Sequence, residues 1–123
     1  MLRHGRPFLA VGAAGGATII TTVLQILINR IDLHMTLPAA LAAPRASQRN
    51  SPTTQAEPAF IAEATTPGLE QLGQKFAVSN TSPLDPTITI PPTIGTASGL
   101  EILPHGRVLV AAEPVAAAAV QQA

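Results

Sequence analysis

The strongest constraint on the fold is the stretch VGAAGGATIITTVLQILI, Val11 to Ile28, where small residues around a glycine pair run into a long apolar segment. Such a stretch is compatible with a phosphate-binding loop, a secretory signal, a membrane span or a catalytic turn. These four alternatives require different residues around the glycines, so the flanking sequence distinguishes them.

The apolar segment has the spacing of a helix. A short apolar strand, Phe8 to Val11, precedes it and is expected to end at Gly12. Apolar residues then recur at helical intervals, at Ile19, Ile20, Val23, Leu24, Leu27, Ile28 and Ile31. Polar residues fill the other side, at Thr18, Thr21, Thr22, Gln25 and Asn29. This pattern predicts a mostly buried amphipathic helix of about fourteen residues, with Thr18 as its N-cap.

A membrane span fits this segment poorly. Residues 7 to 29 carry no charge and lie between Arg6 and Arg30. The helical part, however, reaches only about 21 Å of a hydrocarbon core that is roughly 30 Å thick. Three glycines and a stripe of Thr, Gln and Asn also interrupt the apolar surface. We therefore expect no span.

A secretory signal is the main competing interpretation. Arg3 and Arg6 give a basic start, and Ala40 to Ala42 forms an A-x-A site. Arg30 and Asp32 lie between the apolar run and that site, which a signal peptide does not tolerate well. The alternative function is thus a non-enzymatic exported or membrane-attached protein, which predicts cleavage near Ala42 or retention in the membrane fraction.

Phosphate-binding loops, metal centres and nucleic-acid surfaces lack the residues that they need. The second and third glycines of a dinucleotide loop are Ala14 and Ala17 here, and no Lys follows the glycines as in a P-loop. Seven basic residues balance seven acidic ones, so no basic groove for nucleic acid is indicated. With no Cys and three scattered His, the sequence predicts neither a metal site nor a cofactor.

Shorter elements are expected along the rest of the chain. Thr36 and Pro38 mark the start of a helix over Leu37 to Ala43. Residues 46 to 68 predict a surface excursion with a short strand and an apolar patch at Phe60 and Ile61. The later expected elements are a helix that contains Leu69 and Leu72 and stops at Gly73, a strand over Phe76 to Val78, an edge strand over Thr87 to Ile90, and a hairpin of Leu100 to Leu103 with Val108 to Val110.

Read together with its flanks, the glycine stretch is specific. The segment from Gly5 to Arg45 resembles the gamma-glutamyltransferase (glutathione hydrolase) family over its whole length. The family pattern is a strand, G-S-P-G-G, a helix, an Asn and an Asp one turn on, and a closing APR. In this sequence these elements are Gly12 to Gly16, Ile19 to Gln25, Asn29, Asp32 and Ala43 to Arg45. The segments LEQLGQKFAV and GRVLVAAEP also resemble later parts of the family.

The resemblance implies an α+β fold that is part of the αββα sandwich of N-terminal nucleophile hydrolases. It places residues 1–115 in the C-terminal part of the small, catalytic subunit, with residues 116–123 as a low-complexity Ala-rich tail. In the family, a Thr exposed by self-cleavage attacks the gamma-glutamyl carbonyl of glutathione-like substrates, and water or an amino acid then releases the glutamyl group. By resemblance, the backbone N–H groups of Gly15 and Gly16 form the oxyanion hole.

Three differences from the family pattern bear on activity. Ala13 and Ala14 stand where the family has Ser-Pro, and Val115 replaces the Arg of the last motif. No Thr of the chain lies in the T-T-H-x-S context of the family's nucleophile. The resemblance therefore predicts a fragment that is inactive alone and whose partner is the upstream part of the family chain, the large subunit and the start of the small one. The sequence is compatible with a cytoplasmic, periplasmic or secreted location.

Overall fold

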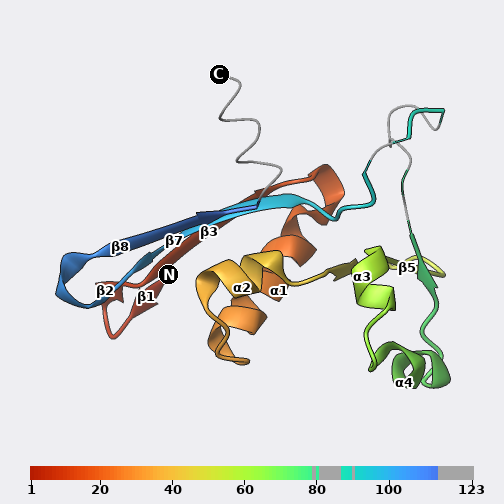
Figure 1. Cartoon of the computed structure of the whole chain (residues 1–123), viewed down its shortest axis with the longest axis horizontal. Coiled ribbons are helices and arrows are strands. Elements are labelled where there is room, and N and C mark those ends of the chain that lie inside the picture. Colours follow the sequence, from red (N-terminus) through yellow and green to blue (C-terminus); the bar gives the residue numbers. More distant parts are fainter. Residues whose placement is uncertain (79, 81–86, 90, 114–123) are drawn as a thin grey trace. The chain divides into compact units, whose positions relative to one another are not determined.

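The computed structural model describes residues 1–78, 80, 87–89 and 91–113. The chain divides into two compact units (Figure 1). The first unit comprises Met1–Ala43 and Gly95–Ala123, and the second comprises Pro44–Ile94. Each unit has its own small sheet and its own helices, so each is described separately.

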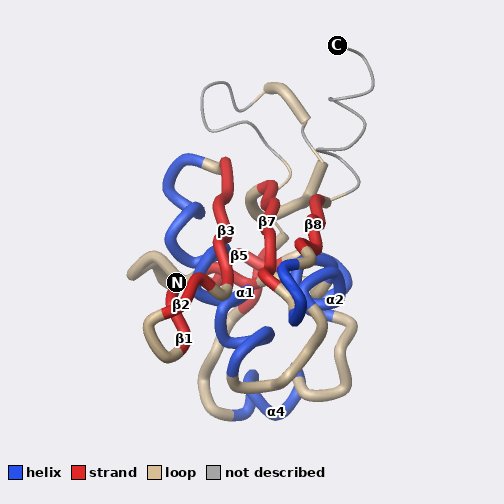
Figure 2. Tube along the Cα trace, turned by 90° about the vertical axis from the view of Figure 1, so that its left-hand side faces the viewer, coloured by secondary structure: helices blue, strands red, loops and turns tan. Residues whose placement is uncertain are grey.

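The first unit is built on a three-stranded antiparallel sheet in the order β3-β7-β8. Its strands are β3 (Leu9–Ala14), β7 (Thr96–Ile102) and β8 (Val108–Ala112), which lie side by side in Figure 2. The predicted hairpin is confirmed, but two predicted bounds are wrong. Strand β3 continues past Gly12 because Gly12 pairs with Ser98, and β7 begins at Thr96 because Thr96 pairs with Ala14.

A two-stranded hairpin precedes the sheet. Its strands are β1 (Leu2–Arg3) and β2 (Arg6–Pro7), and Arg3 pairs with Arg6. His4 and Gly5 form the connection in left-handed conformations, with φ of 51° and 75°. Both central residues of a type I′ hairpin turn need positive φ, so His4 and Gly5 have the conformation that this turn requires.

Two helices cover one face of the sheet (Figure 1): α1 (Ile19–Ile31), which follows the 3₁₀ turn η1 (Gly16–Thr18), and α2 (Leu37–Ala42). The predicted cap of α2 is confirmed, since the hydroxyl of Thr36 accepts from the N–H of Ala39 at 3.3 Å. The predicted cap of α1 is wrong. The hydroxyl of Thr18 makes no capping bond and instead donates to the carbonyl of Gly15 at 3.0 Å.

The side of α1 that faces the core carries both polar and apolar residues. Thr22, Ile26 and Asn29 are buried and Leu27 packs on the core, whereas Ile20 is 79% exposed and Leu24 55% exposed. The sequence correctly predicted an amphipathic helix but not which side would be covered. The core beneath it consists of Phe8, Leu9, Ile26, Leu37, Ala40, Leu41 and Ala97.

The opposite face of the sheet also carries exposed apolar side chains. Val110 of β8 is 71% exposed, and Val108 and Leu100 are exposed as well. All three alternate along their strands with residues that point toward α1 and α2, such as Leu109 and Glu101. A sheet with apolar residues on both faces is typical of a layer that is covered on both sides.

The second unit contains β4 (Ala46–Ser47), β5 (Thr54–Ala56) and β6 (Phe76–Ala77), with α3 (Pro58–Ile61) and α4 (Thr66–Gln71). The short strand predicted within residues 46 to 68 is present as β5. Phe60 and Ile61 lie in α3, and the Phe60 ring packs on that of Phe76 with 5.6 Å between centroids. The predicted stop at Gly73 is confirmed by its left-handed φ of 94°.

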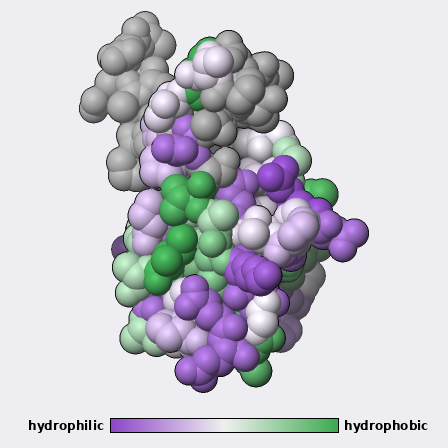
Figure 3. All heavy atoms as spheres, turned by 90° about the vertical axis from the view of Figure 1, so that its right-hand side faces the viewer, coloured by the Kyte–Doolittle hydropathy of each residue, from purple (hydrophilic) through white to green (hydrophobic). Residues whose placement is uncertain are grey.

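Apolar side chains are exposed in the second unit too, with Leu72 at 82%. Figure 3 shows a face of the molecule on which hydrophobic side chains, in green, gather among hydrophilic ones, in purple.

Within the described ranges, no helix is long and apolar enough to cross a membrane. The predicted edge strand over Thr87 to Ile90 lies partly outside the described residues, and the tail of residues 116–123 lies wholly outside them.

We expect the isolated chain to self-associate and to bind a hydrophobic dye such as ANS, because both the sheet and α1 leave apolar side chains in water. Lys in place of Val110 should reduce the association without loss of helix or strand signal, since this side chain is exposed. Sedimentation and dye fluorescence measure both effects. A monodisperse monomer with a cooperative thermal transition would contradict this expectation.

Candidate functional site

The two residues predicted for the oxyanion hole form the turn between β3 and α1. Gly15 has a φ of 153° and Gly16 a φ of 57°, both in the region that favours glycine. The carbonyl of Gly15 accepts from the backbone N–H of Thr18 at 3.2 Å and from its hydroxyl at 3.0 Å. The carbonyl of Gly15 thus points toward the start of α1, where Thr18 holds it with two hydrogen bonds.

One side of the turn is closely packed. A Cβ atom on Gly15 would lie 2.7 Å from the Thr18 hydroxyl and 2.9 Å from the Cα of Gly95. A Cβ atom on Gly95, whose φ is 68°, would lie 2.5 Å from the hydroxyl of Thr22. Gly15, Gly95, Thr18 and Thr22 therefore form a cluster in which the backbone at Gly15 meets the backbone at Gly95, and the side chains of Thr18 and Thr22 fill the remaining space.

The other side of the turn is open. A Cβ atom on Gly16 would meet no atom within 4 Å. In the turns and loops of the described part of the chain, neither Gly15 nor Gly16 donates its N–H to a backbone carbonyl. A left-handed residue directly before a right-handed helical segment tends to turn successive N–H groups toward one point, an arrangement that binds anions. The N-terminus of α1 adds the positive end of a helix dipole.

Gly95 was not singled out from the sequence. It follows Ile94 at the end of a proline-rich segment, where a glycine normally signals only a turn. Its role in the cluster depends on the pairing of Thr96 with Ala14, which brings residues 15 and 95 together from distant parts of the chain. No pattern in the sequence around Gly95 indicates that it lies next to Gly15.

Arg45, which closes the APR motif, lies in the second unit and is 3% exposed. Its guanidinium donates to the carbonyl of Ile94 at 3.1 Å, and its backbone N–H donates to the carboxylate of Glu57 at 2.9 Å. The other oxygen of Glu57 accepts from the N–H of Ile94 at 2.7 Å. These bonds hold together both ends of the second unit.

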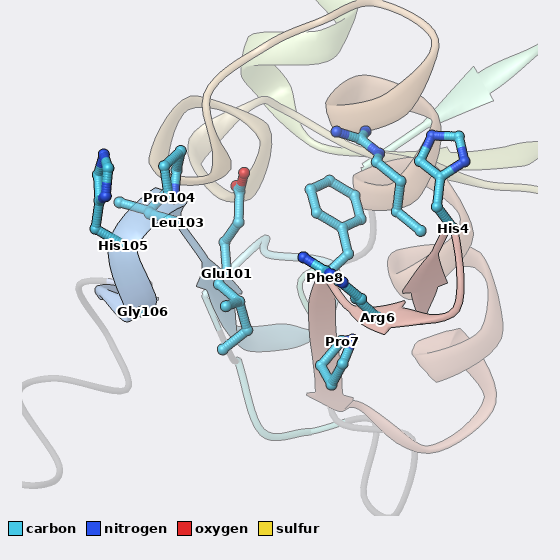
Figure 4. Close-up of a pocket in the computed structure, with 11 residues that line it drawn as sticks. His4, Arg6, Pro7, Phe8, Glu101, Leu103, Pro104, His105 and Gly106 are labelled. Atoms are coloured by element: carbon cyan, nitrogen blue, oxygen red, sulfur yellow. The ribbon is translucent and has the colours of Figure 1, made fainter.

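A separate open pocket of about 960 Å³ lies beside the β1–β2 hairpin (Figure 4). His4 and Arg6 line it from one side, His105 and Pro104 from the other, and Glu101 lies between them. The pocket is at the start of β3, whereas the glycine turn follows the end of that six-residue strand. At about 3.3 Å per residue, the two sites are roughly 20 Å apart.

The only carboxylate lining this pocket is engaged. Glu101 is buried and accepts two hydrogen bonds from Arg30, at 2.9 Å from Nε and 2.5 Å from Nη2. The hydrogen bonds from Arg30 hold the pKa of Glu101 below its usual value, against the opposing effect of burial. An ionised carboxylate that accepts two hydrogen bonds is a poor proton donor at neutral pH. Glu101 therefore acts in this pocket as a structural partner of Arg30 and not as an acid or a base.

Within the described residues, no group of three His, Asp or Glu side chains is placed to hold a metal ion.

The family model described as Gamma-glutamyltranspeptidase matches residues 1–118. The chain belongs to the gamma-glutamyltranspeptidase family. This assignment confirms the resemblance found in the sequence around Gly12 to Gly16 and the closing APR motif.

Curated relatives are much longer than this chain. The glutathione hydrolase proenzyme of Pseudomonas sp. (strain A14) is 40% identical over 76 residues, which are 61% of this chain and 13% of that protein. The glutathione hydrolase proenzyme of Escherichia coli (strain K12) is 28% identical over 114 residues, 93% of this chain and 18% of that protein. The chain thus spans less than a fifth of the length of either relative.

The fold is also shared with solved members of the family. The T380A mutant of Helicobacter pylori gamma-glutamyltranspeptidase superposes with a TM-score of 0.74 at 28% identity, covering 93% of this chain and 57% of that chain. The prediction of a mixed helix and strand fold that forms part of a gamma-glutamyltranspeptidase is confirmed.

The Arg30–Glu101 pair predicts a pH dependence. Because the pKa of Glu101 is lowered in the folded chain, the pair stabilises it above the ordinary glutamate pKa, and this contribution is lost as the pH falls through the lowered value. Glu101→Gln should cost about 2 kcal/mol at neutral pH, since it leaves a half-buried guanidinium without its partner. Amide exchange of β7 and β3 measures the loss as roughly thirtyfold lower protection.

The difference between the original chain and Glu101→Gln should shrink as the pH falls below the ordinary glutamate pKa and vanish only below the lowered pKa of Glu101. Glu70→Gln is the matched control, because Glu70 is exposed on α4 and should change protection of neither strand. Equal protection of β7 in the original chain and in Glu101→Gln at neutral pH would disprove the stabilising role of the pair.

Proposed function

We propose that this chain supplies the oxyanion hole of an enzyme that hydrolyses or transfers gamma-glutamyl groups, and that it cannot turn over substrate alone. Gly15 and Gly16 provide the backbone N–H donors. The threonine nucleophile comes from the upstream part of the family chain, which comprises the large subunit and the start of the small one. The observation that carries the proposal is the Gly15–Gly16 turn, packed against Gly95 on one side and open on the other.

The reaction requires donors where negative charge develops. Attack of a threonine hydroxyl oxygen on the gamma-glutamyl carbonyl moves an electron pair onto the carbonyl oxygen. Two N–H groups that point at this oxygen stabilise it. The charge then returns as the bond to the amine breaks, and the amine leaves with the proton that the threonine hydroxyl gave up. Water or an amino acid attacks the resulting glutamyl ester through a second tetrahedral intermediate, which collapses to expel the threonine oxygen and release the glutamyl product. Loss of one such donor typically costs about 10²–10³ in rate.

The packing explains why the donors are held in place before substrate binds. The Gly15 carbonyl is fixed by two hydrogen bonds from Thr18, and the cluster with Gly95 and Thr22 leaves the turn no space in which to relax. Preorganised donors need no rearrangement when charge develops, which is the main source of their effect. The open side at Gly16 leaves room for the substrate and for the nucleophile.

Release of the chromophore from a gamma-glutamyl anilide tests the proposal. Residues 1–123 alone should give no saturable release, because the chain has no threonine in the T-T-H-x-S context. A chimaera in which this chain replaces the matched region of the Escherichia coli proenzyme should give release. Saturable turnover by the chain alone, or an inactive chimaera that is folded and self-cleaved, would refute the proposal. Cleavage of the native chain near Ala42 would favour the exported alternative instead.

Glycine substitutions in the chimaera separate the donors from general stability. Gly15→Ala should lower kcat by about 10²–10³, because its Cβ displaces Thr18 or Gly95 and the turn with them. Gly16→Ala should have a smaller effect, since its Cβ has space and only the left-handed φ is strained, by roughly 1 kcal/mol.

Gly12→Ala is the matched control. It adds the same methyl group three residues upstream, in the strand and with no atom within 4 Å. The control should leave kcat and self-cleavage unchanged. An equal loss of kcat for Gly12→Ala and Gly15→Ala would show that the turn has no special role.

A further inference from the structure

The outward side of α1 is an apolar stripe with no cover in the first unit. Ile20, Leu24 and Ile28 are 79%, 55% and 41% exposed. They recur at intervals of four residues, so they lie along one side of the helix. Ile31 continues this side and is half-buried. We call Ile20, Leu24, Ile28 and Ile31 the α1 stripe.

The α1 stripe lies opposite the side that packs on the sheet. At 100° per residue, Thr22, Ile26 and Asn29 centre on a direction about 180° from the α1 stripe. The rotation of the helix is fixed at two points. Thr22 fits only beside Gly95, and Arg30 donates twice to Glu101 of β7. The helix therefore cannot roll its apolar side onto this sheet without breaking both contacts.

A four-layer αββα sandwich does not by itself explain this stripe. In such a sandwich the helices form the outermost layers, so the side of a helix that points away from its sheet faces water and is normally polar. The exposed apolar face of the sheet has a ready explanation as the surface that meets the second sheet. The α1 stripe requires a cover of its own.

We propose that the α1 stripe is a docking surface for the upstream part of the gamma-glutamyltranspeptidase chain, which packs an apolar surface against Ile20, Leu24 and Ile28. The proposal rests on the proposed function, because it takes the same upstream polypeptide as its partner. The chain spans only 13% and 18% of two curated relatives, so most of the polypeptide of such an enzyme lies outside these residues. This polypeptide supplies the cover.

The charges of α1 disfavour a membrane surface as the occupant. Helices that lie on membranes usually carry several Lys or Arg on the polar side. Helix α1 has one basic residue, Arg30, which is paired with Glu101. An apolar stripe flanked by uncharged Thr and Gln side chains is instead typical of a helix packed between protein layers.

Cysteine labelling in the chimaera tests this docking. The chain has no cysteine, so a single Leu24→Cys gives one reporter once any cysteines of the upstream part are replaced by serine. We expect a thiol reagent to modify it at least about tenfold more slowly in the folded chimaera than in the isolated chain. Glu70→Cys, on the exposed side of α4, should react at similar rates in both and is the control.

Lysine variants test the energetics of the same surface. Leu24→Lys should improve the solubility of residues 1–123 expressed alone, yet prevent the upstream part and this chain from co-purifying when they are expressed as two polypeptides. Leu72→Lys places the same charge at an exposed leucine of the second unit and should leave co-purification unchanged. Ile20→Lys should behave like Leu24→Lys.

The outcomes separate the docking surface from the catalytic proposal. A protected Leu24→Cys in a chimaera that is folded and self-cleaved but inactive supports the docking and refutes the proposed function. An active chimaera whose Leu24→Cys reacts as fast as in the isolated chain refutes the docking and leaves the oxyanion hole intact. The isolated chain is labelled at a concentration at which sedimentation shows a monomer, because its exposed apolar side chains favour self-association. Equal protection of Leu24→Cys in this monomer and in the chimaera would also refute the docking.

Discussion

The structure of the first unit depends on the close approach of two backbone segments, at Gly15 and at Gly95, beside the side chains of Thr18 and Thr22. A methyl group on either residue would lie within 3 Å of its neighbours. This approach lets β3 reverse into α1 over a few residues, and it joins the turn to the start of β7. It also sets the rotation of α1, because Thr22 is the side chain that fits beside Gly95. Together with the Arg30–Glu101 pair, this contact leaves the apolar stripe of α1 exposed.

Local elements were predictable because their signals are local. The spacing from Ile19 to Ile31, the Thr36 cap and the stop at Gly73 depend on residues within one or two turns, and the structure has each of them. The glycine turn was found because five small residues between a strand and a helix form a motif. The family assignment needed the flanks as well, since the glycines alone fit four kinds of site.

The buried side of α1 and the role of Gly95 were not predictable, because both depend on contacts between residues about 75 positions apart. Hydropathy gives the direction of the apolar side but not which side the rest of the protein covers. The apolar spacing predicts that the apolar side of α1 faces the sheet of this chain. The contacts of Thr22 with Gly95 and of Arg30 with Glu101 instead leave Ile20, Leu24 and Ile28 exposed.

The central claim is that the N–H groups of Gly15 and Gly16 bind the oxygen on which charge develops. The most direct measurement is a crystal structure of the chimaera trapped as its glutamyl ester. The account predicts the ester carbonyl oxygen within about 2.7–3.1 Å of the backbone nitrogens of Gly15 and Gly16. A glutamyl carbonyl held by other donors, with the glycine turn facing water, would contradict it.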